Sequence, residues 1–122
     1  MARNFKAIFG PQTPPTEEEI DEFWSLIAHN KGKGAMHLLI RYMAERRTFR
    51  ERWVGALQQA DLPIRLIDGA ADPISGRHLG ERYQQLIPNP DVVFLDGTGH
   101  YPQIEAPELV VQHFLKFREG SV

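Results

Sequence analysis

Two stretches decide the fold: IRLIDG at residues 64–69 and VVFLDG at residues 92–97. Each is a short apolar run rich in β-branched residues that ends in Asp-Gly, which predicts a strand followed by a turn. The run at 92–95 shows no polar alternation, as is typical of a parallel strand covered on both faces. Helices are predicted at about residues 76–87 and 107–117. The order strand, helix, strand, helix predicts an α/β fold, a right-handed β-α-β-α unit with two parallel strands.

The sequence before Pro63 has helical periodicity instead. Two threonines, each followed three residues later by glutamate, predict capping boxes at helix starts: Thr16 with Glu19, and Thr48 with Glu51. Three helices are expected, at about residues 17–29, 35–47 and 48–60. The chain is therefore expected to divide into a helical cap-like segment, residues 1–61, and a β-α-β-α part, residues 62–122.

Composition narrows the classes of function. The chain has 122 residues, a net charge of −2 and no cysteine. The small net charge argues against a nucleic-acid partner, and the lack of cysteine excludes thiol nucleophiles and zinc-thiolate sites. No stretch approaches the roughly 18 apolar residues of a membrane span. We therefore expect a cytoplasmic protein that does not enter a membrane.

Two loops carry the residues with chemical potential, because reactive groups in parallel sheets collect beyond the carboxyl ends of the strands. Asp72 follows the first predicted strand, and His100 follows the second. Neighbouring strands lie about 5 Å apart, so these two side chains are expected to meet. A carboxylate that accepts the imidazole N–H fixes the tautomer and leaves the other nitrogen free to act as a base.

Other residues compete for these roles. Asp68 and Asp96 also end strands and could bind His100, but each precedes glycine and suits a turn, so Asp72 is preferred. No metal site and no cofactor are expected, since the remaining histidines lack the mutual spacing of metal ligands. These are His29, His37, His78 and His113.

The loop motifs resemble a known superfamily. Gly69-x-x-Asp72-Pro73, then Gly97-x-Gly99-His100-x-Pro102 and Glu105-x-Pro107, are similar to the acid and histidine segments of α/β-hydrolases. The upstream motifs FGP at 9–11, ERR at 45–47 and RWVGAL at 52–57, with Tyr42, resemble the helical cap of the mesoderm-specific-transcript branch, near haloalkane dehalogenases and epoxide hydrolases. The resemblance runs from about Phe5 to Phe117. It implies that Asp72 and His100 are the acid and the base of a catalytic triad, in a truncated α/β-hydrolase fold.

The nucleophile of that triad is not found. In the family it stands on a strand-to-helix elbow of the type Gly-x-Ser-x-Gly, ahead of the acid and the histidine. The serines here are Ser25, Ser75 and Ser121, and none has that context. The resemblance therefore implies a chain that lacks the half of the fold with the elbow.

Two of these serines are candidates for an unconventional nucleophile. Ser75 lies near Asp72, although it also suits the N-cap of the helix at 76–87. Ser25 could point down from the cap, although it also suits a polar helix surface. Trp24, Trp53 and Tyr101 are candidates for lining a substrate pocket, with core packing as the alternative. The basic cluster of Arg46, Arg47, Arg50 and Arg52 fits a solvated helix face better than a phosphate site, because acidic residues intersperse it.

Two functions remain open. The first is weak or complemented hydrolysis of small carboxylic esters by the Asp72–His100 pair, with a non-standard serine or water as nucleophile. The second is a non-catalytic remnant or interaction module. Because two strands alone leave an apolar edge unpaired, we expect self-association through that edge or binding to a complementary hydrolase half. Dehalogenase and epoxide-hydrolase chemistry rank lower, since both need an aspartate on the elbow.

Overall fold

The two strands of the sheet run parallel and in register. The structure, a computed structural model of the 122-residue chain, describes residues 5–120. β1 (Arg65–Gly69) pairs with β2 (Asp91–Leu95), with Arg65 opposite Asp91 and Gly69 opposite Leu95. The mixed α/β class with a two-stranded parallel sheet is thus as expected.

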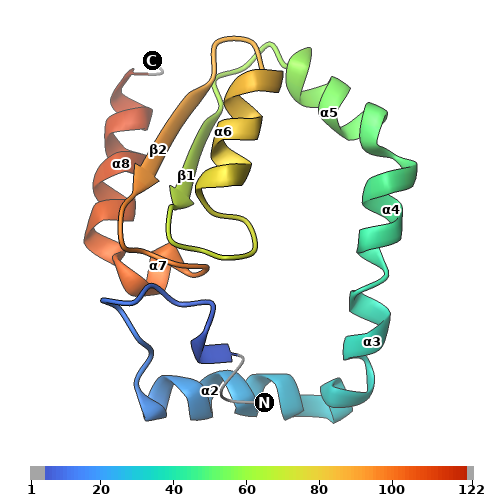
Figure 1. Ribbon diagram of the computed structural model, residues 1–122, viewed down its shortest axis with the longest axis vertical. Helices are drawn as coiled ribbons and strands as arrows, with labels where there is room; N and C mark the ends of the chain where they lie inside the picture. The colour runs from blue at the N-terminus through green and yellow to red at the C-terminus, as the bar shows by residue number, and fades with distance from the viewer. Residues whose placement is uncertain (1–4, 121–122) are drawn as a thin grey trace. The chain divides into compact units, whose positions relative to one another are not determined.

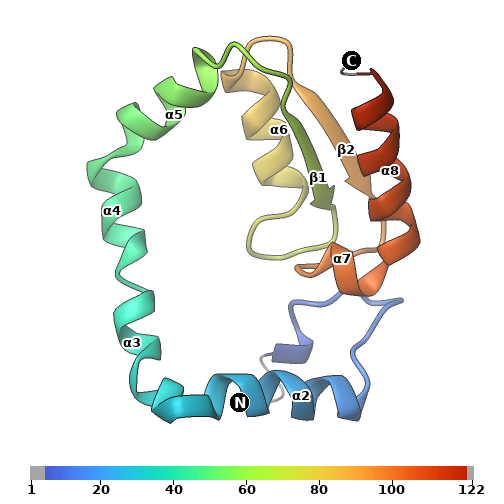
Figure 2. The same ribbon diagram turned by 180° about the vertical axis from the view of Figure 1, so that it is seen from behind.

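Helices flank this sheet. α6 (Arg77–Leu86) lies on one side of the strands and α8 (Pro107–Gly120) on the other, as both views show (Figures 1 and 2). α6 packs closely because it presents Gly80: a Cβ there would lie 2.4 Å from the Phe94 ring. A short helix, α7 (Pro102–Glu105), precedes α8 and was not expected from the sequence. These helices hold the two strand-end loops in place.

The loops after the two strands touch each other. The Ala70 N–H donates to the Leu95 carbonyl at 3.1 Å, and the Ala71 N–H donates to the Thr98 carbonyl at 2.9 Å. Gly69 allows this approach, since a Cβ at that position would lie 1.9 Å from the Gly99 carbonyl oxygen. The carboxyl ends of the strands therefore converge, as parallel topology requires.

The helical segment differs in detail from the expectation. α2 (Glu17–Ala28) begins with the capping box of Thr16 and Glu19, as expected. The expected helix at 35–47 is instead broken into α3 (Met36–Leu39) and α4 (Tyr42–Thr48). A 3₁₀ turn (His29–Gly34) precedes them, and α5 (Arg50–Gln58) follows.

The capping box predicted at Thr48 was wrong. The Thr48 hydroxyl donates back to the Ala44 carbonyl at 3.2 Å, inside the preceding helix. Phe49 occupies the cap position of α5 without a side-chain hydrogen bond. The threonine hydroxyl thus binds the helix before it rather than the helix after it.

The chain forms two compact units by its contacts. One contains residues 16–60, and the other contains the described residues up to Pro15 together with those from Asp61 onward. The predicted division placed residues 1–61 in one segment, whereas residues 5–15 belong to the unit that contains the strands. Buried apolar side chains are few among residues 5–120: Phe9, Ile20 and Leu95.

Candidate active site

The loop after β1 binds the carboxylate of its own residue Asp72. Asp72 is followed by Pro73 and folds into a turn in which the Ile74 N–H donates to Oδ1 at 2.8 Å. The Ser75 N–H and the Ser75 hydroxyl both donate to Oδ2, at 3.0 Å and 2.6 Å. The aspartate predicted to be functional is therefore held rigidly by its own loop.

The structure brings this carboxylate to His100. The Nδ1–H of His100 donates to Oδ2 of Asp72 at 2.8 Å. The side chain of Asp72 is 3% exposed, while that of His100 is 32% exposed. A buried acceptor for Nδ1 fixes the tautomer that leaves Nε2 as the basic nitrogen, and the ring remains open to a small reactant.

The electrostatics of Asp72 suit this role. Burial opposes ionisation of Asp72, but hydrogen bonds from Ser75, Ile74 and His100 outweigh it. The pKa of this carboxyl therefore lies below its usual range, so it is ionised and can stabilise a positively charged imidazole.

Glu105, at the end of α7, is a half-buried carboxylate that accepts several hydrogen bonds. Its Oε2 accepts from the Gly10 N–H at 2.8 Å, from the Thr13 hydroxyl at 2.6 Å and from the Gly99 N–H at 2.8 Å. Its Oε1 accepts from the Tyr101 N–H at 3.0 Å. Burial opposes ionisation of Glu105, but these hydrogen bonds outweigh it, and its pKa is lowered.

Local sequence patterns do not predict this arrangement. The sequence indicates Glu105 only as part of a family motif. Its role as an acceptor is not visible there, because two of its partners lie 95 and 92 residues away in the chain. The available signal in the sequence was a carboxylate shortly after the His100 loop.

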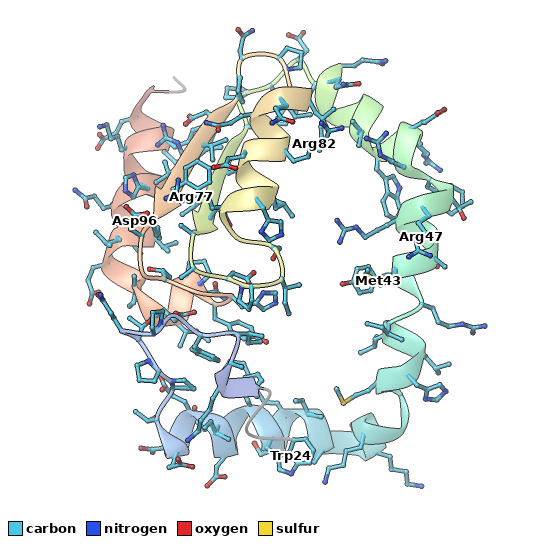
Figure 3. The ribbon with its side chains drawn as sticks, viewed as in Figure 1. Trp24, Met43, Arg47, Arg77, Arg82 and Asp96 are labelled. Carbon is cyan, nitrogen blue, oxygen red and sulfur yellow. The ribbon has the colours of Figure 1, made fainter. Side chains whose placement is uncertain are left out.

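Aromatic residues surround the His100 loop. The Tyr101 ring lies 5.3 Å from the ring of Phe9 and 5.1 Å from the ring of His100. Burial raises the pKa of Tyr101. Tyr101 was predicted to line a pocket, and here it packs beside His100. The other pocket candidates, Trp24 on α2 and Trp53 on α5, are 37% and 42% exposed in the helical unit. The Trp24 side chain is labelled in Figure 3.

The serine candidates are engaged in other bonds. The Ser75 hydroxyl donates to Asp72, and neither it nor any other side chain caps α6, whose cap residue is Gly76. The Ser25 hydroxyl donates to the Glu22 carbonyl at 2.7 Å within α2. Ser121 lies outside the described residues. Ser75 thus supports the acid of the pair.

The competing aspartates have different surroundings. Asp96 forms an exposed ion pair with Arg77 at 2.6 Å (Figure 3). Asp68 is buried at 6% exposure, and its Oδ2 has no hydrogen-bond partner among the described residues. Burial, followed by the nearby charge of Asp72, raises the pKa of Asp68. Neither aspartate forms a hydrogen bond with His100 in the bonds we describe, whereas Asp72 does.

Residues 5–120 show neither a metal-binding cluster nor a membrane-spanning helix. They contain no cluster of three histidine, cysteine, aspartate or glutamate side chains that could hold a metal ion. Among the helices of that range, none is long and apolar enough to cross a membrane.

Comparison with known proteins identifies sequence relatives. No protein-family model matches the chain. The chain is 37% identical over 119 residues to the mesoderm-specific transcript protein of Mus musculus, covering 96% of this chain and 36% of that protein. It is 38% identical over 108 residues to the "Putative hydrolase LipZ" of Mycobacterium tuberculosis, covering 88% of this chain and 38% of that protein. The chain therefore spans less than two-fifths of the length of these relatives.

A solved structure has the same fold. A crystal structure described as that of a membrane phospholipase A, a novel bacterial virulence factor, matches with a TM-score of 0.62 and 22% sequence identity. The match covers 98% of this chain and 37% of that one. At this identity the likeness shows the fold, and the shared region again spans a minor part of the larger protein.

Proposed function

Because the chain belongs to an α/β-hydrolase-like superfamily, we propose that it acts in hydrolysis of small carboxylic esters through the Asp72–His100 pair. The observation that carries the proposal is the 2.8 Å hydrogen bond from Nδ1 of the partly exposed His100 to the buried Asp72. The hydrolase-like relatives support hydrolysis as the class of reaction.

The chemistry of this pair is general-base catalysis. His100 Nε2 takes a proton from a water molecule while the water oxygen forms a bond to the ester carbonyl carbon. Asp72 stabilises the resulting imidazolium. When the tetrahedral adduct breaks its bond to the alcohol oxygen, the imidazolium returns the proton to that oxygen. The products are a carboxylic acid and an alcohol, and the pair is regenerated.

Water fits the role of nucleophile better than the serines of the described residues. The Ser75 hydroxyl donates a hydrogen bond to Asp72, and the Ser25 hydroxyl donates one to a carbonyl of its own helix. A serine supplied by a complementary hydrolase half is the other source. Without an elbow and its oxyanion donors we expect slow turnover, since loss of one such donor costs on the order of a hundred- to a thousandfold in rate.

The test is hydrolysis of p-nitrophenyl acetate and butyrate by the purified chain. His100→Ala and Asp72→Asn should each reduce the rate to that of the background. His37→Ala is the matched control, because an exposed histidine also contributes imidazole to background hydrolysis. An equal rate in the wild-type and His100→Ala proteins would contradict the proposal.

A second candidate is an interaction module that associates with itself or with a complementary hydrolase half. It is favoured by β1, an apolar strand that pairs with β2 and with no other strand within residues 5–120. Unpaired strand edges are templates for association. We place either activity in the cytoplasm, without nucleic-acid or membrane partners. Light scattering of the purified chain tests self-association, and a strict monomer at all concentrations would count against it.

A further inference from the structure

Three consecutive backbone N–H groups at the base of the pair are bound by Glu105 and by the distant residue Ile8. The Gly99 N–H donates to Glu105 Oε2, and the Tyr101 N–H donates to Glu105 Oε1. Between them, the His100 N–H donates to the Ile8 carbonyl at 2.8 Å. The N–H groups of the residues before and after His100 are therefore bound by one carboxylate, and the N–H of His100 itself is bound by a separate segment.

The same carboxylate holds that separate segment. Glu105 Oε2 accepts from the Gly10 N–H and from the Thr13 hydroxyl, while the Thr13 N–H donates to the Gly10 carbonyl at 3.1 Å. Residues 8–13 thus form a turn tied to Glu105, and through it to the His100 loop. We call Glu105 with residues 8–13 the carboxylate clamp.

The fit between the clamp and the loop is tight. A Cβ on Gly99 would lie 2.4 Å from the Ile8 carbonyl oxygen and 2.5 Å from the Gly10 nitrogen. A Cβ on Gly10 would lie 1.8 Å from the Gly97 carbonyl oxygen. Backbone therefore packs on backbone, which leaves the His100 peptide little freedom to shift.

We propose that Glu105 is a positioning residue for the Asp72–His100 pair. Its carboxylate fixes the backbone on both sides of His100 and recruits residues 8–13, so that the His100 ring stays within hydrogen-bond reach of Asp72. The importance of this role for catalysis rests on the proposed function. The geometric effect is independent of turnover, because it concerns the hydrogen bond to Asp72.

A carboxylate suits this position better than an amide. Four donors converge on Glu105, and an ionised carboxylate accepts on both oxygens. In Glu105→Gln one oxygen becomes an NH₂ group that faces donors instead of accepting from them. Thr13→Val removes one donor with nearly the same shape, and Thr13→Ser retains the hydroxyl.

The experiment uses ¹⁵N-labelled full-length chain and follows the Nδ1–H proton of His100, whose bond to a carboxylate protects it from exchange with solvent. We expect Glu105→Gln to speed this exchange by about tenfold, with a smaller increase in Thr13→Val and none in Thr13→Ser. Asp91→Asn is the matched control: it makes the same kind of change at the opposite end of the strands, where Asp91 pairs with Arg65 at 2.8 Å.

The outcomes separate positioning from simple stabilisation. Asp91→Asn should lower stability while leaving the His100 signal unchanged, because Asp91 does not contact the clamp. If Glu105→Gln and Thr13→Val also leave the His100 exchange rate unchanged, the proposal is overturned. If Glu105→Gln fails to fold, the comparison of Thr13→Val with Thr13→Ser decides the matter in the same way.

Turnover gives an independent measure. If the wild-type chain hydrolyses p-nitrophenyl butyrate, Glu105→Gln should lower kcat by about tenfold or more with little change in KM, since a displaced base weakens the chemical step. If wild type and His100→Ala show equal rates, the proposed function fails while the exchange experiment still judges the clamp.

Discussion

The contacts that hold each unit of the chain together internally are of different kinds in the two units. In the unit that contains the strands, hydrogen bonds join residues far apart in sequence, such as Gly10 with Glu105 and Arg65 with Asp91. In residues 16–60 the side-chain hydrogen bonds that we describe are local, as between Thr16 and Glu19. This difference implies that the first unit resists opening as a whole, whereas the second depends on short helices that are marginal alone.

The helical unit, residues 16–60, also buries few of its side chains. Ile20 is the one buried residue of the described stretch 16–60, and large apolar side chains there are exposed. Leu39 is 71% exposed and Ile40 is 61% exposed. An apolar surface of this kind contributes little to stability until something covers it.

Hydrogen exchange should show the largest contrast. Amides of β1 and β2 should exchange at least about a hundredfold more slowly than those of α3 to α5, because local opening is easiest where few contacts are buried. Exchange detected by mass spectrometry on proteolytic peptides measures this. Equal protection in both units would contradict the comparison and would indicate that the helical unit is covered in solution.

Replacing a glycine with alanine should change stability in opposite directions in the two units. Gly99→Ala places a Cβ against the backbone of residues 8–10 and should reduce the free energy of unfolding by about 2–4 kcal/mol. Gly55→Ala on α5 meets nothing within 4 Å and should stabilise that helix by about 0.5–1 kcal/mol through helix propensity. Urea denaturation measures the first effect and circular dichroism the second. Tolerance of Gly99→Ala would show that the His100 loop is looser than described.

The buried Asp68 and the half-buried Glu105 should give stability profiles with opposite dependence on pH. Asp68 has a raised pKa, so its contribution is fully present below the unfolded-state value and is lost as pH rises through the folded-state value. Glu105 has a lowered pKa, so its contribution is present above the unfolded-state value and is lost as pH falls through the folded-state value.

Substitutions at these carboxylates test that sign. Asp68→Asn should raise the free energy of unfolding at neutral pH by about 1 kcal/mol, since it removes a buried charge whose Oδ2 has no hydrogen-bond partner among residues 5–120. The loss of stability as pH rises above the acidic range should also become smaller. Glu105→Gln should lower stability at neutral pH and reduce the acid-side loss. Denaturant titrations from acidic to neutral pH measure both, and parallel profiles for the two variants would refute the assignment.

A helix cap gives a comparably small effect in the helical unit. Thr16→Ala should destabilise α2 by about 1 kcal/mol, because it removes the side chain that accepts from the Glu19 N–H at 3.2 Å. Thr48→Ala is the matched control and should not affect the start of α5, since its hydroxyl binds Ala44. Helicity by circular dichroism compares them. A larger loss in Thr48→Ala would restore the capping box predicted there.

Features that follow from a repeating pattern or from strand topology were predictable, and features that depend on particular contacts were not. The strands, the helix between them and the convergence of Asp72 with His100 follow from periodicity and from parallel topology. The carboxylate clamp depends on residues 8–13 packing on the His100 loop, which no local pattern encodes. The capping box predicted at Thr48 was wrong because the threonine hydroxyl can bind either the preceding or the following helix. The sequence pattern alone does not distinguish these two bonds.

The clamp also has a topological consequence. Since residues 8–13 and the His100 loop are joined, residues 16–60 form an excursion that leaves one unit and returns to it. Closing such a loop costs only about 0.6 kcal/mol more for each doubling of its length. The excursion can therefore lengthen, shorten or be exchanged with little penalty to the strands. A circular permutant with new ends inside it and a linker between the old termini would keep the clamp intact.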